Sequence, residues 1–217
     1  MSVAWGFYSL GTVHRSRRQL ADSEGEHRRA LAIYQRALPA SHPSVAIATY
    51  GLASTLDDAG KHGEAEPQFR AALGMLEKNF GNDHPVVAGT LTGLAKAVRQ
   101  QGRLGEAEPL YRRAREIFER TLGGRHPAVA GPILGLANVA RDQGKGSDAE
   151  TLYARALEIR ESALGPDHPL IARVLEDRAT LLRRAHRGAE ATALEERAQR
   201  LRAGREPAPS TPAAVAK

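Results

Sequence analysis

Residues 84–125 read HPVVAGTLTGLAKAVRQQGRLGEAEPLYRRAREIFERTLGGR, and this stretch decides the fold because the chain repeats its pattern. The dipeptide His-Pro occurs at residues 42, 84, 126 and 168, so each step is 42 residues, with no insertion or deletion. The residues that follow are similar each time: HPSVA, HPVVA, HPAVA and HPLIA. A fixed period of this length is the signature of a protein built from stacked structural repeats.

Alignment of the repeats at each His gives columns of small and apolar residues. In the quoted repeat these are Leu94, Ala95, Ala107, Tyr111 and Ala114. The same columns hold Leu52, Ala53, Ala65, Phe69 and Ala72 in the repeat before, and Leu136, Ala137, Ala149, Tyr153 and Ala156 in the repeat after. Spacings of three, four and seven residues are typical of amphipathic helices. Gly60, Gly102 and Gly144 divide the units where a turn requires positive φ. Each repeat is therefore predicted to be a helix, a tight turn and a second helix.

These columns, Leu-Ala followed by Ala, an aromatic residue and Ala, resemble the tetratricopeptide repeat. The 42-residue unit is more narrowly similar to the long-loop version of kinesin light chains and many bacterial regulators. The resemblance implies an all-α fold, a right-handed α-solenoid of about five helix-turn-helix repeats. It also implies that the first helices line a concave groove for a partner, whereas the second helices form the convex back.

The predicted solenoid covers residues 1–203, in repeats at 1–41, 42–83, 84–125, 126–167 and 168–202. Residues 204–217 are rich in Pro and Ala without periodicity, and we expect a disordered tail there. The first repeat should be the least stable, because His14 and His27 replace apolar columns and Arg18 replaces the turn glycine. In the fifth, Arg178 and Glu195 fill apolar columns, which suits a cap that faces water. An alternative is that the chain is a fragment of a longer array or of a multidomain regulator.

Composition narrows the classes of function. The 217 residues contain no cysteine, which excludes disulfides, thiolate nucleophiles and cysteine-based zinc sites. No stretch reaches the roughly 18 consecutive apolar residues of a membrane helix, and the N-terminal stretch lacks the basic residues of a signal peptide. The sequence has no Gly-rich phosphate loop, GxSxG elbow or HExxH helix. We therefore expect a cytoplasmic protein that is not an enzyme and that uses no cofactor or metal.

The net charge of +6 raises the alternative of a basic helical repeat that binds RNA. However, the net charge alternates in sign from one predicted repeat to the next, so no unbroken basic stripe follows a phosphate backbone. Aromatic residues make up only 5% of the chain, which leaves few rings for stacking on bases. A protein partner is therefore the expectation, and nucleic acid is the alternative.

Four positions on each first helix, at 5, 8, 12 and 15 residues after His, resemble the ligand-facing positions of the family. In the middle repeats they hold Ile47, Tyr50, Ser54 and Asp57; Gly89, Thr92, Lys96 and Arg99; and Gly131, Leu134, Asn138 and Arg141. An apolar stripe beside Lys96, Arg99 and Arg141 suits a peptide with acidic residues and an apolar anchor. The other interpretation is that these are solvated positions on helices. Kinesin light chain grooves are rich in Asn, and only Asn138 matches, so their cargo preference does not transfer. The sequence identifies neither the partner nor the oligomeric state.

Two further features ask for a structural reason. Gly51, Gly93 and Gly135 form a column in mid-helix, where Gly costs roughly 1 kcal/mol relative to Ala. Either close helix packing or a smooth groove floor explains the column, and a Gly93→Leu variant separates the two. Pro132 lies five residues into a helix expected to begin at Pro127, and it should bend or delay that helix.

The pair Asp83-His84 invites comparison with a metal site or a catalytic dyad. The residue before each repeated His is Ser41, Asp83, Arg125 or Asp167, so no acid is required there. Pro suits the first position of a helix, where its missing N–H is not needed. The His-Pro dipeptides are therefore predicted to mark the starts of first helices, with His at or next to the cap.

Overall fold

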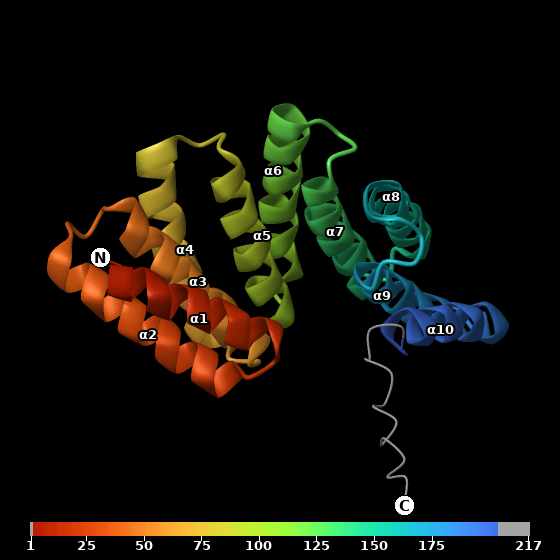
Figure 1. Ribbon diagram of the computed structural model, residues 1–217. Helices are drawn as coiled ribbons and strands as arrows, with labels where there is room; N and C mark the ends of the chain where they lie inside the picture. The colour runs from red at the N-terminus through yellow and green to blue at the C-terminus, as the bar shows by residue number, and fades with distance from the viewer. Residues whose placement is uncertain (1, 204–217) are drawn as a thin grey trace, which may run out of the picture. The chain divides into compact units, whose positions relative to one another are not determined.

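The computed structural model describes residues 2–203, so the tail predicted at 204–217 lies outside the described residues (Figure 1). All regular structure in the described part is helical, which confirms the all-α prediction. The helices are α1 (Ser2–Ser16), α2 (Leu20–Ala37), α3 (Pro43–Asp58), α4 (His62–Phe80), α5 (Pro85–Gln100), α6 (Leu104–Leu122), η1 (Pro127–Val129), α7 (Ala130–Asp142), α8 (Gly146–Leu164), α9 (Leu170–Arg184) and α10 (Gly188–Ala203). The predicted succession of helix, turn and second helix is confirmed in all five repeats.

The helices pack into two compact units, the first ending at Gly124 and the second beginning at Arg125. Within the first unit, α2 packs on both α1 and α3, and α4 packs on both α3 and α5. Within the second unit, α8 packs on both α7 and α9. Each of these second helices thus lies between two first helices, which is the stacking of an α-solenoid.

The repeated His residues are helix caps. The Nδ1 atom of His42 accepts a hydrogen bond from the backbone N–H of Ser44 at 3.1 Å, and His84 does the same for Val86 at 3.2 Å. His126 and His168 cap the starts of η1 and α9 in the same way. Because Nδ1 accepts, its lone pair is committed to the helix start. The prediction that His-Pro marks helix starts is confirmed.

Pro132 delays α7. A 3₁₀ turn at Pro127–Val129 comes first, and the α-helix begins only at Ala130 and has 13 residues, compared with 16 in α3 and in α5. Pro132 thereby falls in the first turn of α7, where a backbone N–H has no partner within the helix.

The turns inside the repeats have a left-handed residue at one fixed place. Gly60, Gly102 and Gly144 have φ between 78° and 80°, as predicted. Arg18 and His186 take the same place in the terminal repeats with φ of 63° and 58°. The first repeat therefore keeps its turn geometry without glycine, at the steric cost that a side chain brings there.

Close packing accounts for the mid-helix glycines Gly51 and Gly93. A Cβ atom built on Gly93 would come within 2.6 Å of Cε1 of Phe69, a fully buried ring on α4. A Cβ atom on Gly51 would come within 2.8 Å of the Tyr8 ring and 2.9 Å of the His27 ring. The rings of Phe69 and His27 are therefore both pressed against the backbone of the next first helix. Of the two interpretations of this column, the structure supports close packing.

His27 is a buried polar residue in a column of aromatic rings. Its Nδ1 atom lies 2.9 Å from the Thr55 hydroxyl, whereas its Nε2 atom is buried without a hydrogen-bond partner in the described part of the chain. Burial, reinforced by the charge of Arg15, lowers the pKa of His27 from 6.5 to about 4. The first repeat is thus built around an imidazole that must stay neutral.

The fifth repeat departs from one expectation. Arg178, predicted to face water, instead reaches α8 and donates to Glu150 at 3.2 Å. The guanidinium group is directed at α8 because a carboxylate on that second helix accepts its hydrogen bond. Glu195 lies on α10 and forms an ion pair with Arg183 at 2.5 Å.

Replacement of Gly93 by Ala should destabilise the first unit by about 1–3 kcal/mol, because the new methyl group overpacks against Phe69. The matched control is Gly89→Ala on the same helix, where a Cβ atom meets nothing within 4 Å. That variant should gain up to about 1 kcal/mol from helix propensity. Urea denaturation followed by circular dichroism measures both, and equal effects would contradict the packing explanation.

Replacement of His27 by Phe, the residue of the same column in α4, should change the pH dependence of stability. Unfolded His binds a proton near pH 6.5, but folded His27 does so only near pH 4. The wild-type protein should therefore lose about 3 kcal/mol relative to the variant as the pH falls from above 6.5 to 4. Urea denaturation at pH 7.5 and pH 4.5 tests this, since a constant difference between the two proteins would refute it.

Candidate functional site

The positions predicted to face a ligand differ in exposure. In the first unit, Ile47, Tyr50 and Thr92 are partly exposed, as a binding surface requires. Ser54 and Asp57 are buried, contrary to a simple ligand-facing position. In the second unit, the buried positions are Leu134 and Asn138. Neighbouring helices therefore use part of the predicted set for their own contacts.

A cluster of ion pairs joins the first helices of the first unit. Lys96 on α5 lies 2.7 Å from the Asp57 carboxylate and 2.9 Å from that of Asp58, both on α3. Arg15 on α1 reaches Asp58 at 3.4 Å, and His62 Nδ1 lies 2.7 Å from Asp57. Burial lowers the pKa of Lys96, but the two carboxylates outweigh burial, and the net shift is upward. Lys96 is thus charged and already neutralised by the protein.

An aromatic and aliphatic area lies beside this cluster. Trp5 is 59% exposed and stacks on Tyr8, with 5.5 Å between ring centroids. The Tyr8 ring in turn lies against Gly51 of α3, one residue after Tyr50. Tyr50 packs edge-on against Phe69 at 5.9 Å. Helices α1 and α3 therefore contribute both to the aromatic rings and to the charged cluster.

Trp5, Tyr8 and Arg15 were not among the residues predicted to face a ligand. They occupy the same columns as Ile47, Tyr50 and Asp57, one period upstream. Extending the alignment of the columns into the first repeat would have identified them. We call the combined set the first-helix face of the first unit: Trp5, Tyr8, Arg15, Ile47, Tyr50, Asp57, Asp58, Thr92, Lys96 and Arg99.

The predicted cation of the second unit is also held internally. Arg141 contacts Asp142 at 3.0 Å and Asp177 at 3.8 Å, and it donates to the Tyr153 hydroxyl at 3.3 Å. Asn138 donates to Asp177 at 3.3 Å and accepts from the Tyr153 hydroxyl at 2.6 Å. Burial lowers the pKa of Arg141, but Tyr153, Asp142 and Asp177 raise it by more, so that the net shift of the Arg141 pKa is upward. The structure thus brings Asn138 and Arg141 together in one buried network.

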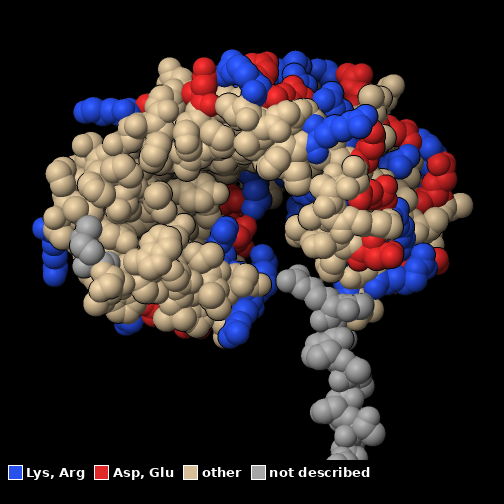
Figure 2. All heavy atoms as spheres, turned by 45° about the horizontal axis from the view of Figure 1, so that its top comes forward, with Lys and Arg blue, Asp and Glu red and all other residues tan. Residues whose placement is uncertain are grey.

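Pairs of opposite charge also connect successive second helices. Glu66 on α4 accepts from Arg103, the residue before α6, at 2.7 Å, and Glu150 on α8 accepts from Arg187, the residue before α10, at 2.8 Å. Burial raises the pKa of Glu66, but hydrogen bonds from Arg70, Gln101 and Arg103 outweigh it and lower the pKa to about 2. On the surface seen in Figure 2, blue and red side chains are interspersed. That distribution does not favour a phosphate backbone as ligand.

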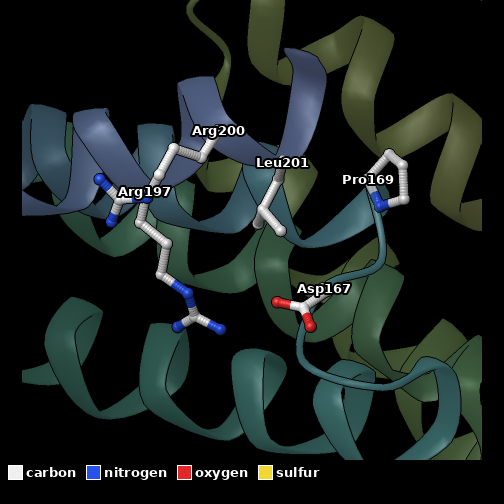
Figure 3. Close-up of a pocket in the computed structure, with 5 residues that line it drawn as sticks. All are labelled: Asp167, Pro169, Arg197, Arg200 and Leu201. Carbon is white, nitrogen blue, oxygen red and sulfur yellow. The ribbon is translucent and has the colours of Figure 1, made fainter. Parts of the chain in front are cut away.

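Cavities outside the predicted site occur in each of the two units. One of about 450 Å³ is lined in the first unit by Leu31, Gln35, Ala40, Val45, Thr49, Gln68, Ala71 and Met75. One of about 590 Å³ is lined in the second unit by Asp167, Pro169, Arg197, Arg200 and Leu201 (Figure 3). In Figure 3 the guanidinium group of Arg197 extends away from α10 into the second cavity, where it donates to Glu161 at 2.6 Å and to the Pro166 carbonyl at 3.0 Å. Neither lining contains a predicted site residue.

Within residues 2–203, no group of three or more His, Asp or Glu side chains is arranged to hold a metal ion. None of the described helices is both long enough and apolar enough to cross a membrane.

Solved structures similar to this chain share its repeat architecture. A putative kinesin light chain of nearly identical TPR-like repeats from Podosopora anserina is 22% identical, with a TM-score of 0.67 over 92% of this chain and 94% of that one. BtubC (BKLC) from P. vanneervenii is 23% identical, with a TM-score of 0.70 over 97% and 85%. A Rap protein complexed with competence and sporulation factor is 16% identical, with a TM-score of 0.67 over 93% and 64%. At these identities the likeness establishes the fold alone.

A comparison with curated protein sequences gives no match. Sequence profiles described as tetratricopeptide repeat, in contrast, match residues 2–78 and 131–203, and residues 87–128. Together with the paired helices, the left-handed turns and the rings packed on glycine, these matches show that the chain belongs to the tetratricopeptide repeat family.

Proposed function

We propose that this chain is a non-enzymatic protein-interaction module that binds a peptide segment of a partner on its first-helix faces. The observation that carries the proposal is the exposed Trp5 ring stacked on Tyr8, on the same helix as Arg15 of the charged cluster. Ile47 and Tyr50 occupy the same columns on α3 and are also partly exposed. A few residues supply most of the binding free energy at protein interfaces, and Trp, Tyr and Arg are enriched among them. The chain has no cysteine, which suits a reducing cytoplasm.

The chemistry of the face indicates the kind of peptide. Lys96 uses its ammonium group on Asp57 and Asp58, so the cluster offers little net positive charge to an acidic ligand. An ammonium group has three donors, however, and one carboxylate of a ligand can join the two already present. The apolar anchor of the peptide is therefore expected to dominate affinity, and an acidic residue is expected to set its register.

Structural neighbours support this class of function. The Rap protein of similar fold was solved in complex with competence and sporulation factor, and other neighbours are a putative kinesin light chain and BtubC (BKLC). Binding of a polypeptide by tetratricopeptide repeats is thus in keeping with the family. The alternative of RNA binding has less support, because acids and bases pair across the repeats.

A phage library of random 12-residue peptides, selected on the wild-type protein, tests the proposal. Binding of the best labelled peptide should weaken by at least about tenfold in a Trp5→Ser, Ile47→Ser variant, because its apolar anchor loses its contacts. Leu122→Ser, at an exposed position outside the face, is the matched control and should bind like wild type. Fluorescence anisotropy measures affinity, and circular dichroism checks helical content.

Charge reversal at Lys96 is unsuitable for this test, because a new carboxylate beside Asp57 and Asp58 would destabilise the fold itself. The proposal is wrong if the Trp5→Ser, Ile47→Ser variant and the control bind the selected peptide equally well. It is also wrong if the library yields no peptide that binds, while random-sequence RNA produces a salt-sensitive gel shift.

A further inference from the structure

One side of α1 has the residues of a helix–helix interface, but no helix of the described chain covers it. We call this side the α1 seam; it consists of Val3, Gly6, Leu10 and Val13. The same columns hold Val45, Ala48, Leu52 and Thr55 in α3, and Val87, Thr90, Leu94 and Ala97 in α5, where every member is at most 3% exposed. In contrast, Val3, Leu10 and Val13 are between 43% and 63% exposed. In Figure 2 the surface beside the start of α1 is largely free of charged side chains.

The other first helices show what covers such a seam. On α3 the cover is α2, whose Tyr34 packs with Val45 and Ala48. On α5 the cover is α4, whose Phe69 ring lies against Gly93. Because α1 has the same columns in the same register, its seam fits an amphipathic helix with the spacing of small, aromatic and apolar residues found in α4.

A column of arginines on the second helices indicates a further property of the helix that would cover the α1 seam. Arg113 on α6 donates to Glu77 of α4 at 2.7 Å, and Arg197 on α10 donates to Glu161 of α8 at 2.6 Å. Arg29 on α2 occupies the same column and is largely exposed. It contacts Glu26 on its own helix at 3.3 Å and lies over the Phe7 ring of α1, 5.7 Å from the ring centroid. A covering helix would therefore place a carboxylate near Arg29, in its C-terminal half, as α4 and α8 do for their neighbours.

A second copy of the chain does not supply such a helix. The corresponding side of α10 carries Glu195 and Arg202 in the columns of Phe69 and Leu76, and they pair with Arg183 and Glu176 of their own unit. An α1 seam from a second copy offers apolar contacts but no acid for Arg29, because α1 contains no Asp or Glu.

We propose that the α1 seam docks a partner helix that residues 2–203 do not contain. This helix is amphipathic, with apolar residues spaced as in α4 and a glutamate in its C-terminal half that pairs with Arg29. This surface is separate from the peptide-binding role proposed for the first-helix face. The two proposals can therefore fail independently.

The probe is a fluorescein-labelled peptide with the sequence of residues 62–80, since α4 covers the equivalent seam of α5. Fluorescence anisotropy should show saturable binding with one peptide per chain. Leu10→Glu should weaken it at least about tenfold, because a carboxylate enters the apolar contact. Leu170→Glu, at a 55% exposed position of α9, is the matched control and should bind like wild type.

A charge exchange tests the polar contact. A peptide with Glu77→Lys should bind the wild-type protein more weakly, and the Arg29→Glu protein should recover its binding. Recovery would not follow from non-specific apolar adhesion. The Trp5→Ser, Ile47→Ser variant should bind the peptide normally, which distinguishes this site from the first-helix face.

Three results would overturn the proposal: no binding at 1 mM peptide, equal binding by the Leu10→Glu and Leu170→Glu proteins, or no recovery on charge exchange. Sedimentation equilibrium of the protein alone provides a further check. A dimer that Leu10→Glu dissociates would show that a second copy covers the seam and would also overturn the proposal.

Discussion

The contact on which the rest of the structure depends is that between a ring on a second helix and a glycine on the next first helix. Phe69 lies on Gly93, and His27 lies on Gly51, with the glycine 24 residues after the ring in both cases. Any side chain at the glycine would hold the helices apart, and any change in the length between ring and glycine would misplace them. This contact therefore explains why the repeats have a fixed length, without insertion or deletion.

The charged columns complement this contact without replacing it. Glu66 with Arg103 and Glu150 with Arg187 join successive repeats, but the arginine side chains are exposed to water, so each pair contributes little to stability. Their regular position makes them better suited to selecting the register of one repeat on the next. Van der Waals contact at the glycines stabilises the packing of one repeat on the next. The ion pairs disfavour packing in which the two repeats are shifted along each other.

Features that depend on local sequence were predictable, whereas those that depend on neighbouring helices were not. The helix pairs, the His caps, the turn glycines and the delay at Pro132 follow from residues close in sequence. Asp57 and Asn138 were predicted to face a ligand, but their helices approach others that bury them. The contact of Lys96 with Asp57 crosses 39 residues and could be seen only once the register between α3 and α5 was known. Arg178, predicted to face water, found its carboxylate on α8 for the same reason.

The first and fifth repeats differ in the columns that a further helix would cover. On α10, Glu195 and Arg202 replace the apolar columns and are neutralised within the unit, so water is an adequate neighbour. On α1, Val3, Leu10 and Val13 keep the apolar columns, so water is a poor neighbour. In a repeat protein the same apolar columns can pack against a helix of the same chain or against a helix of another chain, because the contacts depend only on the residues that meet. The apolar columns kept by α1 therefore favour contact with a further helix, whereas the charged residues in the columns of α10 favour contact with water.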